Sequence, residues 1–212
     1  VAMVGDGAND CGALRVADVG ISLSETEASL AAPFCSGIPT IACAPQLVRE
    51  GRAALATSFA SFKYMTLYSC VQFITVCLLR WYNVNLNASQ FICFDMFTVL
   101  LLGSTLTAAG PRNKIDPQRP TASLLSIPVL SSILSQCAVQ IVFQVIVRLV
   151  LKPQIFATDP MDLEQKPLEA HLAVGFGLRQ LLVPFSAFQY IWTAMIYSIG
   201  GRYRENILRN HR

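Results

Sequence analysis

The sequence of 212 residues predicts an α/β unit followed by an all-α transmembrane bundle of four helices. Only 14% of its residues are charged and 53% are hydrophobic, whereas a soluble domain usually contains about 25% charged residues. The hydrophobic residues are concentrated after residue 62, and the first third of the chain shows the mixed strand and helix pattern of soluble α/β proteins. A soluble part joined to a membrane part explains both observations.

The chain opens with a predicted strand, a turn and a short helix. Residues 1–4 are mostly apolar and predict a buried parallel strand, which the turn at residues 5–7 ends. Asn9 is expected to cap the helix that follows. The apolar face of that helix consists of Ala13, Leu14 and Ala17.

Two acidic residues, Asp6 and Asp10, lie at the carboxyl end of this strand, where open α/β sheets bind ligands. Gly5 and Gly7 flank Asp6 and allow the backbone to approach a phosphate closely. Carboxylate oxygens beside such a turn suit Mg²⁺, a hard cation that usually shares its coordination sphere with phosphate. The alternatives are an ordinary turn and, for Asp10, an acid that interacts favourably with a helix dipole.

Two further strands and a long helix are predicted after this motif. Residues 18–23 form a short stretch with β-branched residues and predict the second strand. Residues 24–27 can open a brief helix, and residues 40–43 form the last predicted strand. Pro45 fits the first turn of a new helix. We therefore expect a soluble domain over residues 1–45 and a stalk helix over residues 46–62 that continues without a break into the membrane.

Four intervals with few charges predict the membrane-spanning helices. They cover about residues 63–82, 89–109, 124–148 and 180–200. Pro128 and Pro184 are expected near the ends of spans, where helices tolerate proline best.

Charged loops predict the orientation of these spans. Loop 110–120 and tail 202–212 are rich in lysine and arginine, whereas segment 152–170 has more acidic than basic residues. If residues 1–45 are cytosolic, the number of crossings also places the loop and the tail in the cytosol. The excess of positive charge on the cytosolic side agrees with that count.

The net charge argues against nucleic-acid binding, and the spacing of the cysteines argues against disulfides and a cysteine metal site. The formal net charge is +3, but the basic residues form short clusters beside the spans instead of one continuous face, so nucleic-acid binding is not expected. The seven cysteines show no CxxC spacing, and those inside apolar runs are expected to pack as small hydrophobic residues.

Asp95 is the one charged residue in the second predicted span. An ionisable group inside a span costs on the order of 2.5–3.5 kcal/mol, so such a group usually faces a cavity or a partner. A cationic substrate is one such partner. The alternatives are a hydrogen bond to a neighbouring helix and a position close to the membrane surface.

Other polar residues lie one helical turn apart within spans. Tyr68 and Gln72 share one face of the first span and can accept hydrogen bonds from ammonium groups, although ordinary bonding between helices is an equal alternative. Gln136, Gln140 and Gln144 repeat every four residues on the third span and predict a polar stripe for helix packing.

The run Gly5-Asp-Gly-x-Asn-Asp10-x-x-Ala-Leu14 resembles the hinge motif of P-type ATPases, in their phosphorylation domain of haloacid-dehalogenase type. Ala8–Leu14 and the following Ala17–Glu25 resemble most the fifth class of these pumps, subgroup B, the polyamine exporters of endolysosomal and vacuolar membranes. Ion pumps of the second class usually have Ala-Pro in place of Cys11-Gly12.

This resemblance implies roles for the soluble residues. Asp6 would ligate Mg²⁺ opposite a phosphorylated aspartate, which belongs to an Asp-Lys-Thr-Gly-Thr motif that this chain does not contain. Asp10 would help to hold the ion. Asn9 would help to hold the phosphate-facing loop, which also includes Gly5 and Gly7.

The resemblance also implies roles for the membrane residues. The four spans would be membrane helices five to eight. Asp95 matches the place of an aspartate in the sixth helix thought to bind substrate amines, and the Tyr-x-x-x-Gln-Phe pattern of Tyr68 and Gln72 resembles a helix that lines the substrate path.

By this resemblance the full-length protein is an ATP-driven and Mg²⁺-dependent pump that moves polyamines or other organic cations from lumen to cytosol. Its partners would be the lipid membrane, the cation and a missing N-terminal part of the same chain, without which no ATP hydrolysis is expected. The alternatives are a subgroup A pump that acts on transmembrane helices, a membrane-anchored phosphatase, and a non-catalytic membrane protein derived from a pump.

Overall fold

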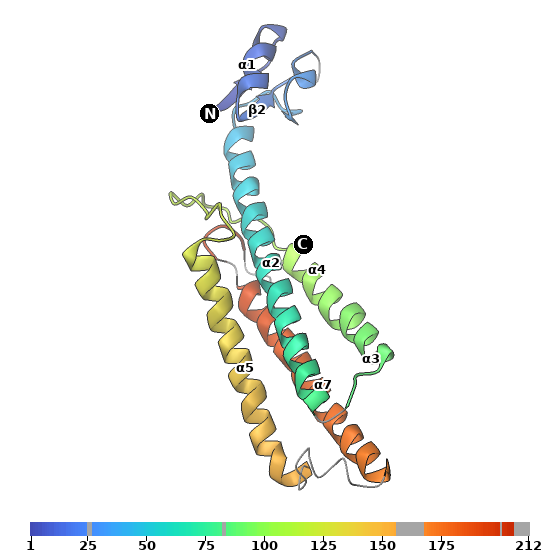
Figure 1. Ribbon diagram of the computed structural model, residues 1–212. Coiled ribbons are helices and arrows are strands. Elements are labelled where there is room, and N and C mark those ends of the chain that lie inside the picture. Colours follow the sequence, from blue (N-terminus) through green and yellow to red (C-terminus); the bar gives the residue numbers. More distant parts are fainter. Residues whose placement is uncertain (25–26, 82–83, 156–167, 200, 206–212) are drawn as a thin grey trace.

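The computed structural model describes residues 1–24, 27–81, 84–155, 168–199 and 201–205. A small parallel sheet lies at one end of a long helix, α2 (Cys43–Trp81), and other long helices lie beside the rest of α2 (Figure 1). The soluble part and the helical bundle are thus joined by one element.

The sheet has three described strands in the order β1 (Ala2–Gly5), β2 (Val19–Ser22) and β3 (Phe34–Cys35), all parallel. β1 and β2 are the first two predicted strands. The third prediction was wrong, because residues 40–43 form a turn that leads into α2 and the short β3 pairs with β2 instead. The carbonyl of Thr40 accepts from the N–H of Cys43 in this turn.

A short helical segment connects β1 and β2. It consists of η1 (Ala8–Asp10) and α1 (Cys11–Val16), and Leu14 is its buried apolar residue. The prediction that Asn9 caps this helix was wrong, because Asp10 occupies the N-cap position of α1 and makes no capping hydrogen bond with its side chain. The expected burial of the first strand was also wrong, since Gly5 alone is buried in β1.

α2 is a continuous helix of 39 residues. Its buried side chains recur every three or four positions, the spacing of one helical face. They are Ala53, Ala60, Tyr64, Leu67, Val71, Thr75 and Leu79. This stripe faces the helices that contact α2, so α2 forms the centre of the bundle. The predicted boundaries at residues 45 and 62 between soluble domain, stalk and membrane part stay a prediction.

The second long helical segment combines α3 (Ala88–Cys93), η3 (Phe94–Leu100), which is a π-helix, and α4 (Leu101–Thr107). It is followed by α5 (Ile127–Ile155) and α7 (Leu168–Ser198). Earlier in the chain, the soluble part also contains a brief 3₁₀ turn, η2 (Glu27–Leu30). α4, α5 and α7 each contact α2, and α7 also contacts α4 and α5.

Three described helices are long and apolar enough to cross a membrane, namely Cys43–Trp81, Ala88–Thr107 and Ile127–Val147. The fourth predicted span stays a prediction. The helix that contains this span, α7, begins at Leu168 and not near residue 180. Pro184 therefore lies in its interior and not near its end. α5 begins at Ile127 and not at 124. The predicted loop 152–170 and tail 202–212 lie partly outside the described residues.

Two loops meet at the end of the bundle nearest the sheet. Pro111, after α4, forms an antiparallel bridge with Arg204, after α7. Arg52 of α2 donates to the carbonyl of Asp116 in the loop after α4, and Figure 1 shows this loop beside the upper half of α2. The basic loop and the start of the basic tail therefore lie on the same side of the bundle as the sheet, as the predicted orientation requires.

Packing of α1 on β2 predicts a size limit at Gly20. A Cβ atom at this position would lie 2.6 Å from the carbonyl oxygen of Leu14. We expect Gly20→Ala to destabilise the soluble part by about 1–3 kcal/mol, as overpacking does, and to lower its melting temperature in the full-length protein.

Gly12→Ala is the matched control, because a Cβ there meets nothing within 4 Å and alanine favours the helix. Equal melting temperatures for the two variants would contradict the packing argument.

Candidate functional site

The loop after β1 is closed by the side chain of Asp10. Its Oδ2 accepts hydrogen bonds from the backbone N–H of Asp6 at 3.2 Å and, more weakly, of Gly7 at 3.5 Å. Asp10 therefore fixes the turn that presents Asp6, whose own side chain is exposed at the carboxyl end of the strand.

The two glycines of this loop differ in what they allow. A Cβ on Gly5 would lie 2.6 Å from both Cβ and Oδ2 of Asp10, so only glycine leaves room for the carboxylate. Gly7 has an extended backbone with φ −115°, and a Cβ there would approach only the backbone nitrogen of Asn9, at 4.0 Å. Close approach of a phosphate to Gly7 stays a prediction.

The donor atoms at this loop fit Mg²⁺ in kind but not in number. Asp6 and Asp10 offer carboxylate oxygens, the ligands that this cation prefers. Within the described part of the chain, however, no group of three or more His, Cys, Asp or Glu residues gathers to hold a metal. A bound ion would need further oxygen ligands from phosphate, water or another part of the protein. The exposed Asn9 is close in sequence, and its role stays a prediction.

In the helical bundle, the structure brings Tyr68 of α2 and Asp95 of η3 together. The Tyr68 hydroxyl donates a hydrogen bond to Oδ1 of Asp95. Gln72 lies one turn further along α2 with its carboxamide beside the same hydroxyl. The three residues that the sequence singled out in the bundle therefore form one polar group across two helices.

The π-helical geometry around Asp95 was missed by the sequence analysis. η3 places Phe94 and Val99 in the core, whereas Asp95 is exposed in the described chain. Among the residues whose side chains the structure describes, which leaves out Arg148 and Arg179, no cationic group lies within ion-pair distance of its carboxylate. Wide helical turns of this kind are frequent at functional sites. No sequence signal for the π-helix stands out in the segment Phe94–Leu100.

Tyr190 of α7 is a further feature of the site that the sequence did not predict. It is 2% exposed, and its ring meets that of Tyr68 edge to face at 5.3 Å and that of Phe94 at 5.7 Å. Tyr190 thus fixes the Tyr68 ring while the Tyr68 hydroxyl remains directed at Asp95. A tyrosine in an apolar helix was the available signal, but its partners depend on how α7 packs.

A separate buried network joins α2, α5 and α7. Nε2 of Gln144 donates to Thr75 Oγ1 at 3.0 Å and to Gln189 Oε1 at 2.6 Å. Gln140 donates to Thr193 Oγ1 at 3.3 Å, and its carbonyl accepts from Gln189. The predicted packing stripe is confirmed for Gln140 and Gln144, whose partners lie on neighbouring helices.

Gln144→Leu should destabilise the bundle by about 1 kcal/mol, because it keeps the volume but leaves two buried acceptors without their donor. The measurement is the thermal melting of the full-length protein in detergent. Gln136→Leu is the control, since Gln136 is only half-buried and forms no hydrogen bond with a described side chain. A Gln144→Leu protein that melts at or above the temperature of the control would refute a stabilising role of the network.

Comparisons with known proteins agree with the motifs. No family model matches the chain. It is 42% identical to the vacuolar cation-transporting ATPase YPK9 of Saccharomyces cerevisiae over 210 residues, which cover 99% of this chain and 14% of that protein. It is 41% identical to the polyamine-transporting ATPase 13A2 of Homo sapiens over 99% of this chain and 18% of that protein.

A third relative is the polyamine-transporting ATPase 13A3 of Mus musculus, 38% identical over 100% of this chain and 18% of that protein. The chain therefore spans less than a fifth of the length of these relatives, and its similarity to them runs through the soluble part and the bundle. The resemblance inferred from the hinge motif is confirmed. The chain belongs to the P-type ATPases of the fifth class, subgroup B, and matches one part of those longer proteins.

Proposed function

We propose that the full-length protein is an ATP-driven pump that couples formation of an aspartyl-phosphate to the transport of an organic cation, of the polyamine class, from lumen to cytosol. The observation that supports this most is the hydrogen bond between Asp95 and Tyr68, because Tyr68 lies on the helix that runs on to the sheet. Two of the relatives are named as polyamine-transporting, and the third is named as cation-transporting.

The polar group in the bundle has the chemistry that an ammonium ion requires. The Asp95 carboxylate supplies the charge, and the oxygens of Tyr68 and Gln72 supply further acceptors. The ring of Tyr190 packs edge to face against the Tyr68 ring and so helps to hold the Tyr68 hydroxyl in this group. The Asp95 carboxylate is exposed and forms no ion pair with a side chain that the structure describes, so a substrate or another helix of the full-length protein can reach it.

α2 provides the mechanical connection in this proposal. At 1.5 Å per residue its 39 residues extend over roughly 60 Å, from the turn after the sheet past Tyr68 and Gln72. A continuous helix cannot shorten without breaking backbone hydrogen bonds, so a displacement at the soluble end moves the other end as well. Phosphorylation and cation binding would be coupled through this displacement.

The soluble part would complete a phosphorylation domain of haloacid-dehalogenase type, whose remainder belongs to the N-terminal part of the same protein. There Asp6 and Asp10 would hold Mg²⁺, and Gly5, Gly7 and Asn9 would form the loop facing the phosphate. Bound Mg²⁺ would neutralise the charge of the phosphoryl group transferred from ATP. The compartment proposed is an endolysosomal or vacuolar membrane, since one relative is named as vacuolar.

The other candidate from the sequence is a non-catalytic membrane protein that derives from a pump. The upstream sequence distinguishes the two, because a pump requires the Asp-Lys-Thr-Gly-Thr motif. The alternative of a subgroup A pump loses support, because the relatives are named for cations or polyamines.

Asp95→Asn in the full-length protein should reduce spermine-stimulated ATP hydrolysis at least about tenfold, because the amide keeps the size of the side chain and removes its charge. Phosphorylation from ATP should persist in the variant. Hydrolysis is measured over a spermine titration, with Asp116→Asn in the loop after α4 as the matched control. Undiminished stimulation of Asp95→Asn would eliminate the proposed cation site.

Asp6→Asn should instead prevent formation of the phosphoenzyme, because the proposed metal site loses a charged ligand. The measurement is the amount of acid-stable phosphate that the protein acquires from radiolabelled ATP. Glu50→Gln, which removes an exposed carboxylate at the soluble end of α2, should be phosphorylated normally. Normal phosphorylation of Asp6→Asn would rule out the metal role.

A further inference from the structure

Two half-buried thiols, Cys70 of α2 and Cys137 of α5, lie beside each other in the bundle. Their side chains interact directly, and neither cysteine is bonded in a disulfide. The spacing of the cysteines in the sequence did not indicate this pair, because its members belong to different helices. Neither thiol belongs to the polar group around Asp95 or to the glutamine network.

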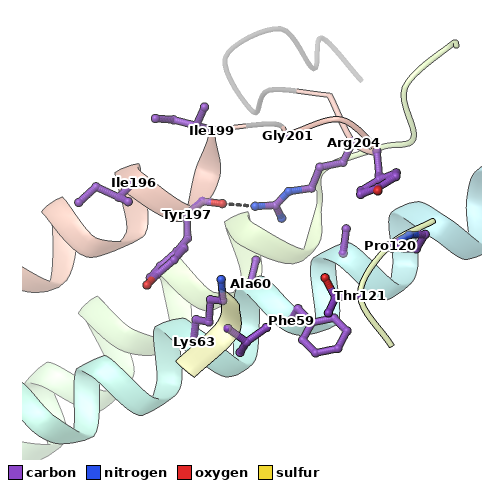
Figure 2. A pocket seen from close by; sticks show the side chains of 13 residues that line it. Phe59, Ala60, Lys63, Pro120, Thr121, Ile196, Tyr197, Ile199, Gly201 and Arg204 are labelled. Atoms are coloured by element: carbon purple, nitrogen blue, oxygen red, sulfur yellow. Dashed lines mark hydrogen bonds between the residues drawn. The ribbon is translucent and has the colours of Figure 1, made fainter. Parts of the chain in front are cut away.

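The contacts on either side of the two thiols fix how α2 and α5 lie against each other. Nearer the sheet, Nζ of Lys63 donates to Ser132 Oγ at 3.2 Å, and Figure 2 shows Lys63 pointing toward Tyr197 of α7. Further along, Nε2 of Gln144 donates to Thr75 Oγ1 at 3.0 Å. Both bonds join residues that are 69 positions apart, so α2 and α5 run in the same direction at a constant register.

This register places the two cysteines on the faces by which the helices touch. Cys70 follows Lys63 by two helical turns, so the two residues share a face of α2. Cys137 precedes Gln144 by two turns and shares its face of α5. Along the helix axes the two cysteines are offset by only about 3 Å, the rise of two residues. The contact and the small offset suit a disulfide, which needs Cα atoms no more than about 7 Å apart.

The surroundings of the two thiols decide which oxidant can reach them. Both are partly exposed on helices that are long and apolar enough to cross a membrane. An aqueous oxidant would meet the exposed Cys35 of β3 first. A hydroperoxide of a lipid acyl chain, by contrast, forms in the apolar phase and is a two-electron oxidant.

We propose that Cys70 and Cys137 form a reversible disulfide when lipid hydroperoxides accumulate in the membrane. The sulfur of one thiol forms a bond to oxygen of the hydroperoxide, the O–O bond breaks, and the thiol proton passes to the departing alkoxide, which leaves as an alcohol. The second thiol then attacks the resulting sulfenic acid. An S–S bond forms, and the hydroxyl leaves with the second thiol proton as water. The two thiols lose two electrons, which reduce one hydroperoxide to an alcohol and water.

The disulfide ties α2 to α5 at the level of the polar group around Asp95. Cys70 lies between Tyr68 and Gln72 in the sequence, but two residues turn a helix by about 200°. The thiol therefore lies on the side of α2 away from that group, and the disulfide blocks sliding or rotation of α2 against α5 without occupying the cation site. This consequence rests on the proposed function, in which displacement of α2 couples phosphorylation to cation binding, whereas formation of the disulfide does not.

The experiment treats the full-length protein in lipid vesicles with cumene hydroperoxide, blocks the remaining thiols with N-ethylmaleimide and identifies linked peptides by mass spectrometry without reduction. A peptide pair joined through Cys70 and Cys137 should appear, and dithiothreitol should separate it. Cys70→Ser and Cys137→Ser should each abolish the pair. Cys77→Ser, which removes an exposed thiol from the same helix, is the matched control and should leave it unchanged. Absence of the pair from the unchanged protein, or equally abundant links to Cys77, would overturn the proposal.

Spermine-stimulated ATP hydrolysis is the functional measurement. Oxidation should lower the rate of the unchanged protein at least about tenfold, because a step that needs α2 to move is blocked, and dithiothreitol should restore the rate. Cys70→Ser should keep its rate through the same treatment. Linked protein that hydrolyses ATP at the full rate, or an equal loss in Cys70→Ser, would show that the disulfide does not control the pump. The rate before oxidation tests the pump itself, so failure of the proposed function is distinguishable from failure of this inference.

Discussion

The bundle depends on one constraint, the continuous stripe of buried side chains on α2. Lipid is as apolar as a leucine side chain, so hydrophobic burial alone cannot hold helices together inside a membrane. The stripe supplies the other interactions that are needed. Tyr64 and Val71 make close packing contacts that include aromatic rings, and the hydroxyl of Thr75 is hydrogen-bonded. α7 and α5 are thereby attached to α2 along most of its inner face, and the exposed faces remain for other contacts.

The same helix also links the two polar sites. At its soluble end lies the sheet with the Asp10-closed loop, and in the bundle it supplies Tyr68 and Gln72. Between them, Arg52 bonds the loop after α4, and Lys63 lines a pocket together with Arg204. These polar groups are therefore arranged along a single element.

Sequence patterns predicted the features that depend on local composition. The apolar runs located β1, β2 and the long helices, and residue spacing indicated that Tyr68 and Gln72 share a face. The two residues of β3 were too short to give a pattern, and the start of α7 was misplaced because Leu168 begins a helix that includes charged residues. Contacts of Tyr190 and the pairing of the loop after α4 with Arg204 depend on packing between distant segments.

η3 has a consequence for the orientation of the carboxylate at position 95. A π-helical turn accommodates one residue more than an α-helical turn, and each residue of an α-helix advances the chain by about 100° around the axis. The faces of α3 and α4 are therefore out of phase with each other. If the extra residue moved along the segment, Asp95 would rotate away from the Tyr68 hydroxyl while both flanking helices kept their places. The carboxylate could then change its neighbours by a small shift in winding, without any movement of the bundle.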